Sequence, residues 1–191
     1  MKKITLIVGF VSISSILLAQ NAVGLKAGLN FSEITNYDAS MKVGFHVGGL
    51  AHLHITPAFS LQPEFMFSSQ GSKQQNNVPG VNLNYINIPV LLQYNFDNGF
   101  RVQGGPQIGF RLSAKDFLFD SESDISDRTQ SIDFSIPLGL SYLGNSGLGF
   151  DARYNIGVTN VFTNPAENYR NSVMQVGIFY LLNHKHKQAS K

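Results

Sequence analysis

Apolar and polar residues alternate along almost all of the chain after residue 22. From Val23 to Phe31 every second residue is apolar, and the residues between them are glycine, lysine or asparagine. A period of two is typical of a β-strand with one face in an apolar environment. The same pattern predicts seven further strands, over residues 43–54, 59–67, 86–96, 100–112, 132–141, 148–156 and 174–182.

The connections between these predicted strands alternate between long and short. Long connections fall at 32–41, 70–82, 113–130 and 159–171, and short ones with turn-forming residues fall at 55–57, 97–99 and 144–146. Outer-membrane barrels have short periplasmic turns and long extracellular loops, and an even number of strands. The pattern therefore predicts an all-β fold, an eight-stranded antiparallel up-and-down transmembrane β-barrel over residues 23–183.

The polar faces of the predicted strands are rich in glycine and carry a minority of charged residues. A solvated sheet face favours Lys, Glu and Thr, whereas the lumen of an eight-stranded barrel is only wide enough to be filled by side chains. We therefore expect the arginines to face carboxylates inside the barrel, with Glu64, Asp133 and Asp151 as their partners. The predicted polar network of the lumen, a structural one, comprises Lys26, His46, Glu64, Arg101, Arg111, Asp133, Asp151 and Arg153.

Aromatic residues on the apolar faces fall near the strand ends, as expected for the girdles at the two membrane interfaces. One predicted band lies towards the long loops and contains Phe31, Phe45, Phe67, Phe110 and Phe134. The other lies towards the short turns and contains Phe59, Phe96, Phe100, Tyr142 and Tyr180.

Four prolines fall inside predicted strands, where each removes a hydrogen bond from the ladder. They are Pro63, Pro89, Pro106 and Pro137. We expect a β-bulge at each of them.

The first 22 residues have the three parts of a secretory signal. A basic start at Lys2 and Lys3 precedes an apolar stretch from Ile4 to Leu18, and small residues follow, so we expect cleavage after Ala19 or Ala22. The apolar stretch is shorter than the roughly 20 residues that span a bilayer. The sequence thus predicts export to the outer membrane of a Gram-negative bacterium, with residues 184–191 as a polar C-terminal tail.

Composition narrows the possible functions. Charged residues make up 14% of the chain, against roughly 25% in ordinary soluble domains. The net charge is +2 and the basic residues are scattered, so no nucleic-acid surface is predicted. With no cysteine there is no disulfide, thiolate metal site or cysteine nucleophile.

The histidines of the second predicted strand offer candidate chemistry. His46, His52 and His54 share its polar face, and hairpin pairing about Thr56 would bring His46 within a couple of residues of Glu64. Such a pair could act as a base with its orienting group. A lipid-modifying barrel hydrolase needs its Ser, His and acid on the outer wall, whereas these residues face the lumen. We therefore predict no enzymatic activity and no cofactor.

The third long loop is acidic. Its acidic residues are Asp116, Asp120, Glu122, Asp124 and Asp127. Alternating carboxylates could offer oxygen ligands to calcium, but the loop lacks the turn glycine of an EF-hand, and a solvated extracellular loop is the simpler interpretation. His184 and His186 in the tail could also touch a metal, although two histidines rarely form a site. No metal site is predicted, and calcium binding by residues 113–130 stays open.

Five segments resemble the PorT-type outer-membrane β-barrel family. They cover residues 24–31, 61–64, 85–94, 104–109 and 151–160, in the order of that family and over nearly all of the predicted mature chain. The most distinctive are Tyr85-Ile86-Asn87-Ile88-Pro89 and Asp151-Ala152-Arg153-Tyr154. The resemblance implies a fold and a membrane. The family's namesake is an accessory to a secretion system, and that role does not transfer to so broad a family.

Together these features predict an integral outer-membrane protein without enzymatic activity, which presents its loops for envelope structure, adhesion or partner binding. The expected partners are outer-membrane lipid and an extracellular or periplasmic protein. Two alternatives stay open: an accessory of protein secretion or small pore, and a soluble periplasmic ligand-binding barrel.

Overall fold

The computed structural model describes residues 22–119, 121–164 and 168–182. The predicted tail over 184–191 and the predicted signal, apart from Ala22, lie outside these ranges. Ten strand segments and one short helix are present: β1 (Ala22–Ile34), β2 (Ser40–His54), β3 (Phe59–Lys73), β4 (Gly80–Asn95), β5 (Phe100–Gly104), β6 (Gln107–Leu118), β7 (Ser121–Asp124), η1 (Ser126–Arg128), β8 (Ile132–Leu143), β9 (Leu148–Asn160) and β10 (Arg170–Leu182). Within these ranges no helix is long and apolar enough to cross a membrane.

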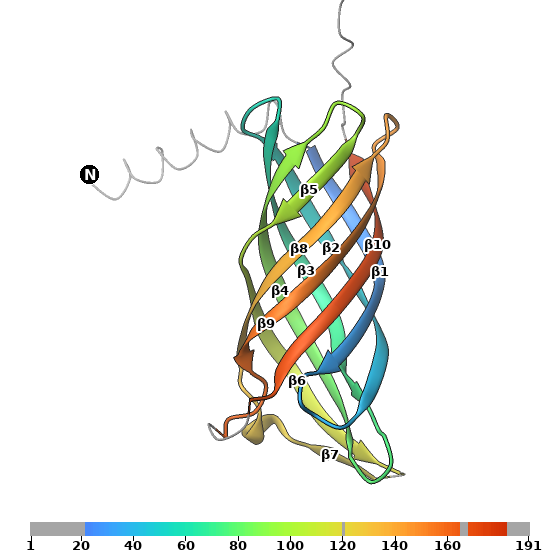
Figure 1. The fold of residues 1–191 in the computed structure, drawn as a ribbon, viewed down its shortest axis with the longest axis vertical. Coiled ribbons are helices and arrows are strands. Elements are labelled where there is room, and N and C mark those ends of the chain that lie inside the picture. The colour runs from blue at the N-terminus through green and yellow to red at the C-terminus, as the bar shows by residue number, and fades with distance from the viewer. Residues whose placement is uncertain (1–21, 120, 165–167, 183–191) are drawn as a thin grey trace, which may run out of the picture.

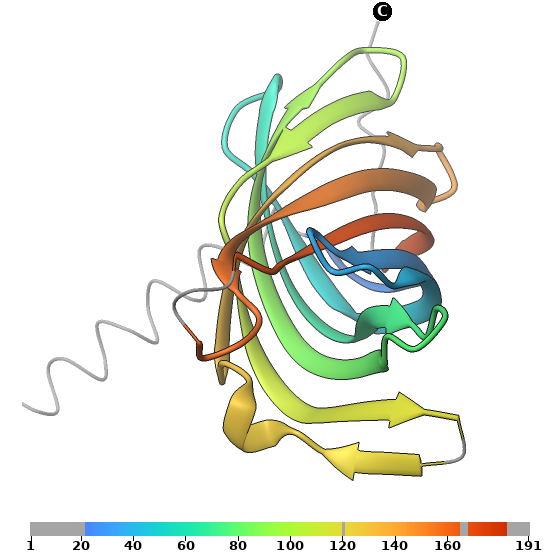
Figure 2. The same cartoon turned by 60° about the horizontal axis from the view of Figure 1, so that its bottom comes forward.

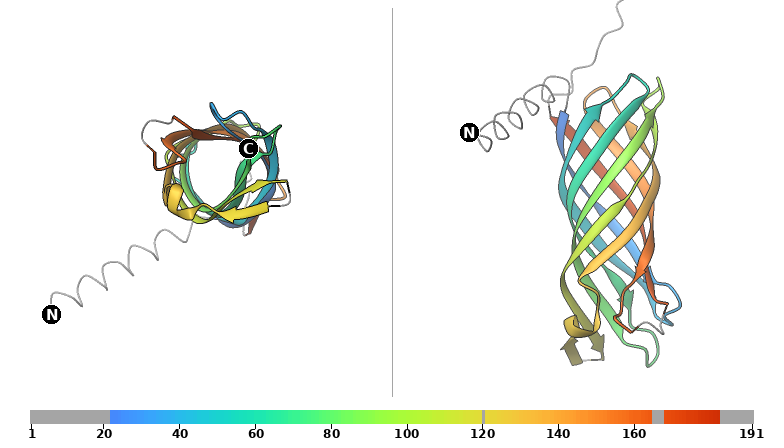
Figure 3. Two further views of the ribbon diagram at one scale, coloured as in Figure 1. Left: turned by 90° about the horizontal axis from the view of Figure 1, so that it is seen from below. Right: turned by 90° about the vertical axis from the view of Figure 1, so that its left-hand side faces the viewer.

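The strands form a closed antiparallel ring, which Figures 1 and 3 show from the side and along its axis. β5 and β6 share one position in the wall, because both pair with β4 on one side and with β8 on the other. β7 pairs with the far end of β6 and leaves the wall. Counting β5 and β6 as one position and leaving out β7, the ten segments occupy eight positions in the ring. The predicted eight-stranded up-and-down barrel is therefore confirmed.

The two ends of the barrel differ. One end, called the turn end, carries the three short turns together with the start of β1 and the end of β10. The other, called the loop end, carries the four longer connections, at 35–39, 74–79, 119–131 and 161–169. These loops are shorter than predicted, because β3, β4 and β6 continue beyond the predicted strands, in β4 with Val81 and Leu83 on the buried face, and because β7 and η1 occupy part of 113–130.

Alternation along each strand separates an apolar outer face from a buried inner face. On β1, Leu25 is 67% exposed while Lys26 is 2% exposed, and on β8 Leu138 is 52% exposed. The outer face also carries many aromatic side chains, with ring pairs in contact at Phe45 and Phe67 and at Phe100 and Tyr142. The wall therefore presents a nearly continuous apolar surface, which suits lipid.

The prediction of a bulge at each proline is wrong. Pro63 stays opposite Val90, and Pro137 stays opposite Asn155, with no shift of register in either strand pair. Pro89 likewise lies opposite Gln107 in register. A residue in an antiparallel ladder directs its N–H to one neighbour only, so proline removes one hydrogen bond without requiring an extra residue.

Pro106 has a different effect, because it separates β5 from β6 while the register with β4 and β8 continues across it. Its carbonyl accepts a hydrogen bond from the Val90 N–H at 2.9 Å, and the Pro137 carbonyl accepts one from the Gly105 N–H at 3.2 Å. The register shifts lie instead between Met41 and His46, between Asn84 and Tyr85 and between Arg170 and Ser172.

Replacing Leu138 by Arg tests the outer face. Because this face is predicted to contact lipid, an arginine near the middle of β8 should lower the free energy of unfolding by about 2–4 kcal/mol. Denaturant unfolding of the barrel in lipid vesicles would measure the change. The control is Asp97→Arg, which introduces an arginine in an exposed turn and should leave stability unchanged. Equal losses of stability at the two positions would contradict a lipid-facing wall.

Candidate functional site

Four buried charged side chains meet in the middle of the lumen. Lys26 donates to Asp151 Oδ2 at 2.5 Å and to Glu64 Oε1 at 3.3 Å. Arg153 donates through Nη1 to Glu64 Oε2 at 2.8 Å, and Gln62 donates to Glu64 Oε1 at 2.8 Å. The charged side chains are 0 to 2% exposed. The Arg153–Glu64 pair connects opposite sides of the barrel, because β9 and β3 lie four positions apart in the ring, and Lys26 on β1 lies midway between them.

Amides extend this cluster towards the loop end. Arg153 Nε donates to Gln175 Oε1 at 2.8 Å, and Gln175 donates to Asn30 Oδ1 at 2.7 Å. Asn30 Oδ1 also lies 2.8 Å from His46 Nδ1, and Asn30 Nδ2 donates to Ser68 Oγ at 2.9 Å. An amide oxygen only accepts hydrogen bonds, so the proton of this contact belongs to His46 Nδ1.

Glutamines extend the cluster in the other direction, towards the turn end. Gln93 Nε2 donates to Gln62 Oε1 at 3.1 Å and to Gln103 Oε1 at 2.7 Å. A continuous hydrogen-bonded chain thus runs along the lumen from β5 to β2. Connected polar groups of this kind join the strands across a narrow interior, while His46 Nε2, Gln103 Nε2 and Asp151 Oδ1 are buried without partners.

His46 and Glu64 do not form the predicted base and orienting group. His46 lies opposite Ser68, and Glu64 lies opposite Leu50. The offset between the two residues is therefore four positions rather than a couple, because the hairpin is centred one residue later than expected. Each side chain is instead held by the other groups of the network.

Two of the predicted network residues lie apart from it, near the loop end. Arg111 donates to the carbonyl oxygens of Gln130 and Ser126, each at 3.0 Å, rather than to a carboxylate. Asp133 accepts a hydrogen bond from Thr159 Oγ1 at 2.8 Å. The remaining predicted residue, Arg101, is buried close to the turn end.

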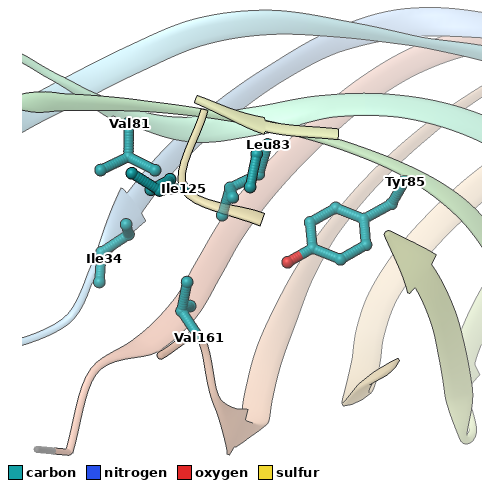
Figure 4. Close-up of a cluster of buried hydrophobic side chains, with 7 residues drawn as sticks. Ile34, Val81, Leu83, Tyr85, Ile125 and Val161 are labelled. Carbon is teal, nitrogen blue, oxygen red and sulfur yellow. The ribbon is translucent and has the colours of Figure 1, made fainter. Parts of the chain in front are cut away.

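Both ends of the lumen contain buried apolar clusters that the sequence pattern did not indicate. At the loop end, shown in Figure 4, the cluster comprises Ile34, Val81, Leu83, Tyr85, Ala114, Ile125 and Val161. At the turn end it comprises Ala22, Leu50, Leu143, Phe179 and Leu181. Apolar side chains packed at both ends oppose a continuous aqueous path through the barrel.

The loops cover the first of these clusters and are connected to one another. Tyr37, Phe162 and Tyr169 pack against it, with ring centroids 5.6–6.0 Å apart. Backbone and side-chain hydrogen bonds join the four loops in a circuit, through the pairs Thr35 and Arg170, Tyr37 and Pro79, Gln74 and Phe119, and Arg128 and Thr163. We call this assembly the cap.

Two acidic residues of the third loop, Glu122 and Asp124, make contacts within that loop. Lys115 donates to Glu122 at 2.6 Å, and this hydrogen bond and the carboxylate charge raise the pKa of Lys115. Asp124 accepts a hydrogen bond from the Ser126 N–H at 2.7 Å, and hydrogen bonds from Ser126 lower the pKa of this carboxyl. Among the described residues, which exclude Asp120, no three His, Asp or Glu side chains are grouped to hold a metal ion.

Comparison with known proteins identifies the family. The model of the outer membrane protein beta-barrel domain matches residues 18–163. The chain belongs to this family. It is therefore an outer-membrane β-barrel protein, and the soluble periplasmic barrel is set aside. The finer PorT-type resemblance is not tested by this match and stays a prediction.

Solved structures agree on the fold. Neisserial surface protein A (NspA) is 16% identical, with a TM-score of 0.56, and the match covers 85% of this chain and 97% of that one. Ail, the attachment invasion locus protein of Yersinia pestis, is 12% identical, with a TM-score of 0.53 and the same coverage. A second structure of Ail, in complex with the heparin analogue sucrose octasulfate, has a TM-score of 0.52 at 12% identity, again covering 85% and 97%. None of the curated proteins matches the sequence significantly.

Glu64→Gln tests the central ion-pair cluster. Removing the carboxylate leaves Arg153 and Lys26 buried with a single acid between them, so the barrel should lose about 3–5 kcal/mol of stability. Denaturant unfolding in lipid vesicles would measure this loss, and adding Lys26→Gln to the variant should recover part of it. Glu122→Gln, in the exposed ion pair with Lys115, is the matched control and should change nothing measurable. Equal stability of Glu64→Gln and wild type would show that the cluster does not hold the barrel together.

Proposed function

We propose that this chain is a non-enzymatic outer-membrane protein whose barrel holds the cap outside the cell for contact with a partner. In this arrangement residues 1–22 serve as the export signal, and the turn end faces the periplasm, as is usual for short turns. The observation that carries the proposal is the contrast between a filled lumen and a cap whose four loops are joined in one circuit.

The part of the cap best suited to contact is the ribbon formed by β6 and β7, which projects beyond the wall (Figure 2). At its tip Phe119 is 72% exposed and has a φ of 53°, a conformation that bulky residues rarely adopt. Its N–H donates to Gln74 Oε1 at 2.8 Å, which fixes the tip against the second loop. Exposed aromatic side chains held in place are typical anchors of protein interfaces.

The similarity to Ail supports contact outside the cell, since that protein is named for attachment and one of its structures holds a heparin analogue. The ribbon of this chain carries more acidic than basic residues: Asp116, Glu122 and Asp124 lie beside Lys115. A protein surface with an apolar pocket and basic residues therefore fits the ribbon better than a sulfated polysaccharide does.

Adhesion of bacteria that display the protein tests this function. Cells should adhere to plates coated with extracellular-matrix proteins more than cells without the protein, and more than to heparin-coated plates. Phe119→Asn removes the ring and keeps a residue that tolerates the left-handed conformation, so it should lower adhesion several-fold, whereas Phe119→Tyr should retain it. Folding of each variant is verified by its heat-dependent gel shift. Adhesion no greater than that of cells lacking the protein, on every coating, would overturn the proposal.

Conductance measurements test the filled lumen separately. Purified barrel added to planar lipid bilayers should give no stepwise conductance, because apolar side chains occupy both ends of the lumen. Steady channel openings of the folded protein would contradict the proposal and favour the small pore instead.

A further inference from the structure

A buried cation near the turn end has no partner among the described residues. Arg101 lies on the inner face of β5 and is 6% exposed, and its Nη1 is buried without a hydrogen-bond acceptor. The other buried bases of the lumen, Lys26 and Arg153, each contact a carboxylate within 3.3 Å. Burying a charge is unfavourable unless a group of opposite sign or several hydrogen bonds compensate it.

Two of the three buried carboxylates of the lumen are bound to other cations, although one oxygen of Asp151, Oδ1, is buried without a hydrogen-bond partner. Glu64 and Asp151 already share two cations, Lys26 and Arg153, so the addition of Arg101 leaves three positive charges and two negative ones in this part of the barrel. The third buried acid, Asp133, lies eight residues along β8 from Ser141, which pairs with Arg101. At 3.3 Å per residue, that separation is about 26 Å.

Two further hydrogen-bond donors without acceptors lie beside Arg101. Ser141 is directly opposite it on β8, and its buried Oγ has no partner. Gln103 follows two residues later on the same face, where its Oε1 accepts from Gln93 and its Nε2 is left without an acceptor. A guanidinium, an amide N–H and a hydroxyl together suit a ligand that offers negative charge and lone pairs.

This part of the lumen is also next to a polar side of the turn end. Asn95, which pairs with Arg101, is only partly buried and donates through Nδ2 to Ser60 Oγ at 3.1 Å. The apolar cluster of the turn end is built from β1, β2, β8 and β10, whereas Ser60, Gln93 and Asn95 lie on the buried faces of β3 and β4 at this end. We expect a small hydrated solute to reach Arg101 from this polar side.

We propose that Arg101, Gln103 and Ser141 bind a small inorganic anion inside the turn end of the barrel. The anion supplies the negative charge that the lumen lacks at this point, and it accepts hydrogen bonds from these three side chains. The site is independent of the cap and of the function proposed for it. The acid nearest to the site is Asp151, which pairs with Ser141 across β8 and β9 and is held by Lys26. Asp151 is the competing partner that the test must separate from a bound anion.

The test compares the thermal stability of the purified barrel, in zwitterionic detergent, in sodium chloride, sodium phosphate and sodium gluconate at equal ionic strength. Circular dichroism at one heating rate gives the midpoint. Chloride or phosphate at roughly 100 times its Kd should raise the wild-type midpoint by about 5 °C over gluconate, the bulky reference anion that we expect to be excluded from the lumen. Arg101→Gln should abolish this difference. Arg111→Gln is the matched control and should keep it, because Arg111 is bound by backbone carbonyls instead.

A second variant keeps the test decisive if Arg101→Gln does not fold. Ser141→Asp places a carboxylate opposite Arg101, so its midpoint in gluconate should reach that of the wild type in chloride and should no longer respond to the salt. Broadening of the ³⁵Cl NMR line by the folded wild type, and its absence with Ser141→Asp, would report binding directly.

Equal wild-type midpoints in the three salts, with no broadening of the chloride line, would overturn the site and leave Asp151 as the group that compensates Arg101. Loss of the salt response in Arg111→Gln as well would also overturn it, because the response would then reflect the charge of the whole lumen.

Discussion

Pairing between β1 and β10 closes the wall, and the other features of the barrel depend on that closure. The two strands are in register from Val23 and Leu182 to Ile34 and Asn171. An unpaired backbone group in lipid costs several kcal/mol, so a sheet in a membrane has no tolerable edge. With eight positions in the ring, the lumen is narrow enough that side chains must fill it. An apolar outer face and a crowded polar interior both follow from this geometry.

The narrow interior also explains why a few charges are sufficient to connect the whole wall. Lys26, Glu64 and Arg153 come from strands that are not neighbours, yet their buried side chains meet in the lumen. Glutamines and asparagines extend the cluster through neutral hydrogen bonds, which avoids additional buried charge. The arrangement leaves the positive charge of Arg101 outside the cluster.

Prolines and register shifts lie in different parts of the barrel. In the half near the turn end, prolines interrupt hydrogen bonds but not the register. The register shifts lie near the loop end, where the strands leave the ring and the ribbon of β6 and β7 projects. Bulges bend strands and redirect side chains. Together with the buried cluster beneath the loops, they give the cap a defined shape on top of a regular barrel.

The sequence by itself determined the strands, their inner and outer faces and the alternation of short and long connections. These features depend on residues close together in the sequence: Leu25 and Ala27 share one face of a strand, and Lys26 between them lies on the other. The environment of each face directly favours apolar or polar residues there. Only the tertiary structure decided which base meets which acid. Partners across a barrel depend on register and closure, so a hairpin centred one residue later separated His46 from Glu64.

The apolar clusters also escaped prediction from sequence. Ile125 and Val161 lie in loops outside any periodic pattern, and they become core residues because the closed ring brings distant loops over one opening. The bulges predicted at the prolines were wrong for a related reason. The effect of a missing N–H depends on which neighbouring strand that N–H would have faced, and the sequence does not show this. The local alternation of residues determines which face of a strand is apolar, whereas closure of the ring determines which side chains meet across the lumen.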